Sequence, residues 1–217
     1  MKNLAFAAAA ALTTTGAILT APAIFAQETP SAPGAVDASR ITGGTYALDP
    51  SHTLVDWQVD HFGFNDYIGL FGNISGTMTM QPDNINDAKF DIMIPIADVT
   101  VASAQLKDHL LRPGKDGGQP DFFGPEPGMA QFTSTNVRQN GDTTAIVSGM
   151  LDMNGKAGPV TMLVEFTGAG TNPFNKKETV GFQARATIDR TDWGIMYGQG
   201  LVGNDVDLTI TAAFEKQ

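Results

Sequence analysis

The sequence contains no cysteine and few basic residues, and each shortage excludes classes of protein. With no Cys in 217 residues, the chain has no disulfide scaffold, no thiol chemistry and no cysteine-ligated zinc or iron–sulfur cluster. Thirteen Lys+Arg against 23 Asp+Glu give a formal net charge of -10. Since so acidic a surface repels phosphate backbones, we expect no nucleic acid among its partners.

Histidine and the common catalytic motifs are also scarce. His52, His61 and His109 lie far apart in the sequence and form no H-x-H or H-E-x-x-H zinc spacing. No G-x-S-x-G nucleophile motif is present. We therefore expect no metal, no cofactor other than a bound ligand and no catalytic residue, so that the chain is not an enzyme.

Long apolar runs are confined to the beginning of the chain. Lys2 supplies a short positive start, residues 4–19 are rich in Ala and Leu, and small residues lead to Ala26. This order is that of a cleaved secretory signal peptide, which we assign to residues 1–26, with cleavage after Ala23 left open as an alternative. No other run approaches the roughly 18 apolar residues of a spanning helix. We expect a periplasmic protein with no transmembrane segment in the mature chain.

The remaining sequence divides into a short linker and one domain. Residues 27–43 are rich in Pro, Ala, Ser and Gly and show no apolar periodicity, which predicts a flexible linker. Residues 44–217 form the domain. A second Pro/Gly-rich stretch at 113–128 has similar patterns on both sides, so we interpret it as a long loop within that domain.

The domain has the period-two alternation of β-strands. On one face of the first such segment lie Val55, Trp57 and Val59, with Asp56 and Gln58 on the other. The same alternation recurs along the domain. The segments that show it are 55–61, 74–80, 90–96, 145–153, 160–167, 180–188 and 205–210. A strand with one solvent-exposed and one buried face is typical of an antiparallel sheet. Only residues 99–111 look helical. Closure removes exposed edges, so the pattern predicts an all-β, eight-stranded, lipocalin-like barrel with one short helix.

Alternation by itself does not say which face is buried, because an outer-membrane barrel turns its apolar face outward. The chain has only 3 Tyr and 2 Trp, too few for two aromatic girdles. We therefore expect the apolar face inside. Small inward residues such as Gly76, Gly149 and Ala184 leave room for a ligand, or else let the barrel taper and fill itself; the composition leaves both readings open.

Several blocks of residues, in order along the domain, carry a family resemblance. Residues 46–53 read YALDPSHT, and Val55, Trp57, Val59 and His61 alternate before Phe62-Gly63-Phe64. Later blocks are Leu106-Lys107-Asp108-His109-Leu110, Asp121-Phe122-Phe123, Pro159-Val160-Thr161 and Asp189-Arg190-Thr191-Asp192-Trp193-Gly194. From about residue 44 to 214 the chain resembles the YceI-like family of exported, lipocalin-like polyisoprenoid-binding proteins. Asn154 stands where the family usually has His, so a role for that His does not transfer.

The resemblance implies a barrel that holds a long isoprenoid chain, either a polyprenyl lipid or an isoprenoid quinone, in an apolar interior channel. It implies no enzymatic activity. The residues expected to line the lipid channel are apolar strand positions together with phenylalanines of Gly-rich loops, the latter expected at the mouth. The wall candidates are Trp57, Val59, Met78, Met80, Phe90, Ile92, Val164, Phe166 and Phe182, and the mouth candidates are Phe62, Phe64, Phe122 and Phe123.

Other functions and partners stay open at this stage. One alternative is a hydrolase or isomerase acting on a prenyl-type lipid, with His61 or His109 as general base. Another is an adhesion module that uses the exterior of a filled barrel. The sequence also leaves open a homodimer and a delivery partner such as a membrane cytochrome or a transport protein.

Overall fold

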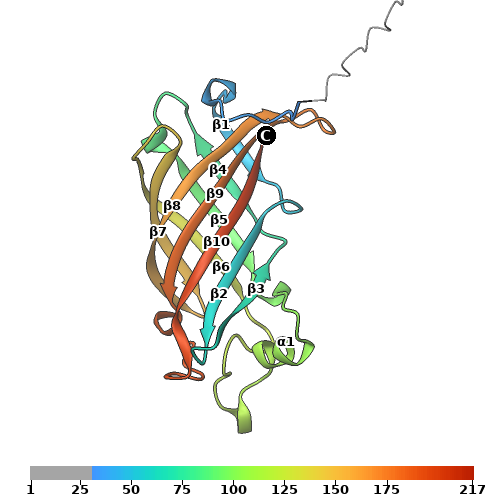
Figure 1. Cartoon of the computed structure of the whole chain (residues 1–217), viewed down its shortest axis with the longest axis vertical. Coiled ribbons are helices and arrows are strands. Elements are labelled where there is room, and N and C mark those ends of the chain that lie inside the picture. The colour runs from blue at the N-terminus through green and yellow to red at the C-terminus, as the bar shows by residue number, and fades with distance from the viewer. Residues whose placement is uncertain (1–30) are drawn as a thin grey trace, which may run out of the picture. The chain divides into compact units, whose positions relative to one another are not determined.

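A computed structural model describes residues 31–217; the predicted signal peptide and the first residues of the predicted linker lie outside the described residues. One antiparallel sheet dominates the fold (Figure 1). Its strands are β1 (Gly44–Leu48), β2 (Leu54–His61), β3 (Asn65–Phe71), β4 (Ser75–Met80), β5 (Lys89–Pro95), β6 (Met129–Gln139), β7 (Thr144–Met153), β8 (Lys156–Thr171), β9 (Glu178–Asp189) and β10 (Val202–Lys216). The α-helix within residues 31–217 is α1 (Ala104–Leu111), and short 3-10 turns are η1 (Ala38–Arg40), η2 (Ile85–Asp87), η3 (Ile96–Asp98), η4 (Lys115–Gly117) and η5 (Arg190–Trp193).

The sheet closes on itself as an eight-stranded barrel. Hydrogen-bonded neighbours run β1-β4-β5-β6-β7-β8-β9-β10, and β10 then returns to β1 through register pairs such as Tyr46↔Lys216. β2 follows β1 along the same edge of β10, pairing Trp57 with Leu208, and β3 pairs with β2. The predicted antiparallel eight-stranded barrel with one short helix is confirmed.

The barrel has two different ends, visible in Figure 1. At the helix end lie α1, the β2–β3 hairpin and the 190–201 segment. At the opposite end, here called the open end, lie η1, the β4–β5 connection with η2, and the β6–β7 and β8–β9 hairpins. The C-terminus is also at the open end, since Gln217 donates its N–H to the carbonyl of Thr45.

The core lies inside the ring of strands, as the alternation predicts. Buried apolar side chains come from alternate positions of successive strands, for example Val55, Met78, Val147, Val180 and Phe214. The predicted interior therefore exists, with its apolar face inside.

Three strands, β1, β3 and β6, were missed by the sequence analysis, and for β3 and β6 the structure shows the physical reason. In β6 the buried residues Ala130 and Phe132 are separated from buried Val137 by an odd number of positions. A register shift between Ser134 and Asn136 accounts for this, because a β-bulge exchanges the two faces of a strand. In β3, Ile68 is an exposed apolar residue between the inward positions Tyr67 and Gly69, which hides the alternation.

The predicted helix over 99–111 is shorter in the structure. Thr100 exchanges both main-chain hydrogen bonds with Leu70 of β3, at 2.8 and 2.9 Å, which holds this segment extended. The helix begins only after Ser103, whose hydroxyl accepts from the N–H of Leu106 as an N-cap. The predicted loop at 113–128 is observed, with only η4 inside it.

The predicted linker requires correction for residues 35–43, which pack on the barrel. Ala35 exchanges main-chain hydrogen bonds with Ala169 of β8 at 3.1 and 2.8 Å. Ile41 is buried, and Thr42 donates its N–H and hydroxyl to Glu178 at 3.0 and 2.6 Å. A Pro/Ala/Ser/Gly composition indicates weak local propensity, but the barrel supplies the partners that order this segment.

A buried arginine holds the backbone of residues 195–203 at the helix end. The Arg190 guanidinium donates to the carbonyls of Ile195, Tyr197, Val202 and Gly203 at 2.7–3.1 Å. Trp193 lies beside it, with its indole N–H bonded to the carbonyl of Leu151 at 3.0 Å. In residues 31–217, no helix combines the length and apolarity needed to cross a membrane.

Candidate functional site

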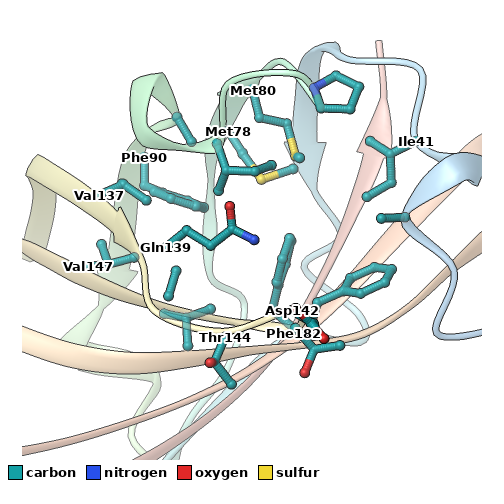
Figure 2. Close-up of a pocket in the computed structure, with 18 residues that line it drawn as sticks. Ile41, Met78, Met80, Phe90, Val137, Gln139, Asp142, Thr144, Val147 and Phe182 are labelled. Carbon is teal, nitrogen blue, oxygen red and sulfur yellow. The ribbon is translucent and has the colours of Figure 1, made fainter.

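A first cavity, the upper cavity, opens at the open end of the barrel and has a volume of about 180 Å³. Figure 2 shows its lining, which includes Met78, Met80, Phe90, Phe182 and Gln139. Ala38 and Ile41 of the segment before β1 also line it, so this segment forms part of the mouth. Polar lining groups such as Asp142 and Thr144 come from the β6–β7 hairpin, which lies at the rim.

A second cavity, the central cavity, lies deeper in the barrel and has a volume of about 130 Å³. Its lining comes from strands on every side of the barrel, including Ile92, Val160, Ala184 and Ile210, and Thr53 is the one polar side chain in it. The Thr53 hydroxyl is satisfied because it accepts the N–H of Ala213 at 3.2 Å. This space is therefore suited to hydrocarbon.

The two cavities adjoin one another. They share Phe90, Val147, Val164 and Phe182 as lining residues. No Lys or Arg is among the residues that line them. Together the two adjoining cavities, here called the channel, extend from the open end into the middle of the barrel. Their lining offers no cation to neutralise an anionic group.

Most of the predicted wall residues lie where the channel is. Those that line one or both cavities are Met78, Met80, Phe90, Ile92, Val164, Phe166 and Phe182. Trp57 and Val59 lie on the same face of β2 as Val55, nearer the helix end, and line neither cavity. The contact of each of these residues with lipid stays a prediction.

The predicted mouth residues are at the other end of the barrel. Phe62 and Phe64, in the β2–β3 hairpin, are exposed, the latter 86%. Phe122 and Phe123 are half-buried in the loop after α1, and Phe123 packs edge-on against Phe71. None of them lines either cavity, because the channel opens beside the β6–β7 hairpin instead.

The histidines considered as general bases lie outside both cavities. His61 alternates with Trp57 along β2, yet it is exposed at the end of the strand and stacks on Phe62. His109 of α1 bonds through Nε2 to Asp121 at 2.8 Å, and Arg112 donates to the same carboxylate oxygen at 2.8 Å. The hydrogen bonds from Arg112 and then His109 hold the pKa of Asp121 below its usual value.

That histidine belongs to a packed aromatic cluster at the helix end. The rings of His109, Phe122 and Tyr197 contact one another with centroids 4.8–5.4 Å apart. The cluster joins α1, the loop after it and the 195–201 segment. Among residues 31–217, no group of three or more His, Cys, Asp or Glu is placed to hold a metal ion.

A hydrogen-bonded carboxylate fixes the open end. Burial disfavours the ionised form of Glu178, but hydrogen bonds from Thr42 and Tyr46 outweigh it and lower the pKa of this carboxyl. Tyr46 donates its hydroxyl to Glu178 at 2.6 Å. Burial and then this partner raise the pKa of Tyr46 to about 12. The contacts attach the segment before β1, and with it Ile41, to the rim of the channel.

Several lining residues were missed by the sequence analysis. Ala38 and Ile41 lie in the segment predicted to be a flexible linker, and Val137 follows the bulge of β6. The signal available for Ile41 was a single apolar residue just before the domain. For Val137 no local pattern could have indicated the inward side, because the bulge reverses it.

Comparison with known proteins agrees with this geometry. The YceI-like domain family matches residues 46–214. A UPF0312 protein of Pseudomonas putida (strain GB-1) is 30% identical over 188 residues, which cover 84% of this chain and 92% of that protein. A UPF0312 protein of Serratia proteamaculans is 28% identical over 179 residues, 81% of this chain and 88% of that protein.

Solved structures share the fold. BcnA of Burkholderia cenocepacia superposes with a TM-score of 0.59 at 20% identity, covering 76% of this chain and 98% of that one. A polyisoprenoid binding domain from Saccharophagus degradans gives a TM-score of 0.56 at 13% identity, covering 79% and 98%. With a family match over nearly all of the barrel, this chain belongs to the YceI-like family.

Proposed function

We propose that this protein binds and carries a long-chain isoprenoid lipid with an uncharged head group, a polyprenol or an isoprenoid quinone, inside its barrel. The observation that carries the proposal is the pair of adjoining apolar cavities within a closed eight-stranded barrel. A neighbour of the same fold is described as a polyisoprenoid binding domain, and the present cavities have the lining that such a ligand requires.

The energetics favour a hydrocarbon chain. Removing apolar surface from water contributes about 25 cal/mol per Å² before the costs of binding. A chain of isoprene units matches a lining of Met, Phe, Val and Ile, and methionine side chains adapt to an irregular ligand. No charged contact is needed for affinity.

The charge of the lining selects among isoprenoid head groups. A phosphate buried without a cation loses its hydration with nothing to replace it. The described lining offers Asp142 at the rim and no Lys or Arg. This supports a neutral lipid over a polyprenyl phosphate. The enzymatic alternative has no comparable support, since His61 and His109 line neither cavity, and the proposed carrier uses no cofactor.

A substitution that fills the central cavity tests the proposal. Ala184 lies between its register partners Val164 and Ile210, and all three line that cavity. In Ala184→Phe we expect the ring to occupy lipid space and to weaken binding about tenfold or more, which corresponds to a loss of about 1.4 kcal/mol. Gln183→Phe is the matched control, because Gln183 immediately precedes Ala184 in β9 and its side chain is exposed.

The measurement is lipid content and uptake. Protein purified from its own host is extracted with organic solvent and analysed by mass spectrometry, and the emptied protein is titrated with ubiquinone and polyprenol. We expect a prenyl-type lipid in the wild type and in Gln183→Phe, and little in Ala184→Phe. A wild-type protein that is empty and takes up neither lipid contradicts the proposal.

The proposed periplasmic location has its own test. Cell fractionation should place the protein in the periplasm, and the mature chain should begin at Gln27, or at Ile24 if cleavage follows Ala23. A full-length chain in the cytoplasm would contradict export, but it would leave the proposal of lipid binding unaffected.

A further inference from the structure

Two buried polar atoms inside the barrel have no hydrogen-bond partner among residues 31–217. They are the indole Nε1 of Trp57 and the hydroxyl of Tyr67. Other buried donors of the same kinds are paired: Trp193 donates to the carbonyl of Leu151 at 3.0 Å, and Tyr46 donates to Glu178 at 2.6 Å. A buried donor without an acceptor lowers the stability of the folded state, and such donors are rare in native proteins. Two of them side by side therefore indicate that a ligand atom supplies the acceptor.

The two side chains are neighbours on adjacent strands. Tyr67 of β3 is the register partner of Val59 on β2, two positions from Trp57. The two rings stack with centroids 6.2 Å apart and an angle of 29° between their planes. The indole ring lies on Gly69, where a Cβ would overlap it. Both donors are therefore held by the β2–β3 hairpin.

The pair lies beside the deep end of the channel. Val55 and Leu208 line the central cavity. Trp57 is the next residue beyond Val55 on the same face of β2, and its register partner on β10 is Leu208. A ligand that fills the channel from the open end thus approaches these two donors with its innermost atoms.

The chemistry of the donors selects the group that they would hold. An indole N–H only donates, and a phenol hydroxyl donates well, so their common partner is an oxygen with free lone pairs. Arg190, a buried basic side chain at the same end of the barrel, already donates to four carbonyls. A neutral carbonyl or ether oxygen therefore fits better than an anion.

Building on the proposed function, we propose that Trp57 and Tyr67 form the polar terminus of the lipid channel and donate hydrogen bonds to the carbonyl or ether oxygens of a quinone-type head group. The head group lies innermost, and the isoprenoid tail extends toward the open end. The channel thereby distinguishes a lipid that bears a neutral acceptor from a plain isoprenoid hydrocarbon.

Paired ligands and conservative variants test this assignment. The ligands are a short-chain ubiquinone and an isoprenoid hydrocarbon of the same chain length. The variants are Trp57→Phe and Tyr67→Phe, which remove the donors and keep aromatic rings, with Tyr197→Phe as the control at an exposed tyrosine. We expect wild type to prefer the quinone, each donor variant to lose about tenfold in quinone affinity, equivalent to about 1.4 kcal/mol, and hydrocarbon affinity to stay unchanged.

Two further readouts separate recognition from a structural role. Without ligand, the Tm of Tyr67→Phe should be equal to or above that of wild type, because the substitution removes an unpaired buried hydroxyl. In wild-type protein, infrared bands of isotope-labelled quinone carbonyls should shift to lower frequency than in hexane. This second measurement needs no variant, so it decides the question even if a substitution prevents folding.

The outcomes distinguish the two proposals. If neither ligand binds wild type, the carrier proposal fails. If both bind but quinone affinity is the same in wild type and both donor variants, or the carbonyl bands do not shift, the donors hold at most a water molecule and the head-group assignment is overturned.

Discussion

The indole ring of Trp57 lies directly on Gly69, its register partner across the β2–β3 hairpin. A methyl group at residue 69 would overlap the six-membered ring and Nε1. The absence of a side chain at one strand position thus determines where the indole of the facing strand lies.

Gly69→Ala should therefore destabilise the barrel. We expect a loss of about 1–3 kcal/mol in the free energy of unfolding, typical of overpacking a filled interior, measured by urea denaturation. Gly128→Ala serves as control, since nothing lies within 4 Å of a Cβ there. Equal stability of the two variants would show that Trp57 moves aside freely.

The Glu178 carboxylate should make stability depend on acid pH. Its folded pKa lies below the ordinary value of 4.5, so its contribution is present above that value and is lost as the pH falls through the folded pKa. We expect Glu178→Gln to lower the free energy of unfolding by about 1–3 kcal/mol at neutral pH, as for charged hydrogen bonds, and the difference from wild type to shrink in acid. Thermal unfolding across pH 3–8 measures it.

The control for that series is Glu165→Gln, at an exposed position of β8. It should show no comparable loss. A constant difference between Glu178→Gln and wild type down to the lowest pH would mean that the charge of Glu178 contributes nothing.

Substitution of Arg190 should destabilise the fold. Lysine retains the charge but cannot reproduce a guanidinium that donates to four carbonyls. We expect Arg190→Lys to lose about 2–4 kcal/mol, since buried acceptors are left unpaired, in guanidinium denaturation. Arg185→Lys, at an exposed site on β9, should leave stability unchanged. An Arg190→Lys variant as stable as wild type would show that the four hydrogen bonds of the guanidinium do not stabilise the fold.

Asp121 should protect the loop after α1 from proteolysis. Its carboxylate accepts from both His109 and Arg112, and Asp121→Asn removes the charge that both donors share. We expect faster chymotrypsin cleavage at the neighbouring Phe122 and Phe123, followed by mass spectrometry. Glu126→Gln, an exposed change in the same loop, should cleave like wild type; identical cleavage in both variants would show that the loop is held by ring packing alone.

The fold could be predicted largely from residue pattern. Strands with uninterrupted alternation, such as β7 and β9, were found close to their observed bounds. The strands β1, β3 and β6 were missed. In β6 the bulge reverses the two faces halfway along, and in β3 Ile68 adds an apolar residue on the outer face. Alternation of apolar and polar residues does not predict a strand where the backbone departs from the regular pleat.

The candidate site was predictable in part. Met78, Phe90 and Phe182, which were predicted to contact lipid, line the observed cavities because their side chains point into the barrel. Their contact with lipid stays a prediction. Phe62 and Phe64 were expected at its mouth but lie at the opposite end. Which end of a barrel is open depends on how its loops pack, and sequence alternation is the same in both directions.

The alternating strands, the apolar interior and the family resemblance could be inferred from the sequence alone, because they depend on residue order along single segments. Three features became visible only in the tertiary structure: Ile41 packs on the barrel, the channel opens beside the β6–β7 hairpin, and the Trp57 indole N–H and the Tyr67 hydroxyl are buried with no hydrogen-bond partner among residues 31–217. Those features arise from residues far apart in the chain, which meet only when β10 returns to β1 and closes the ring.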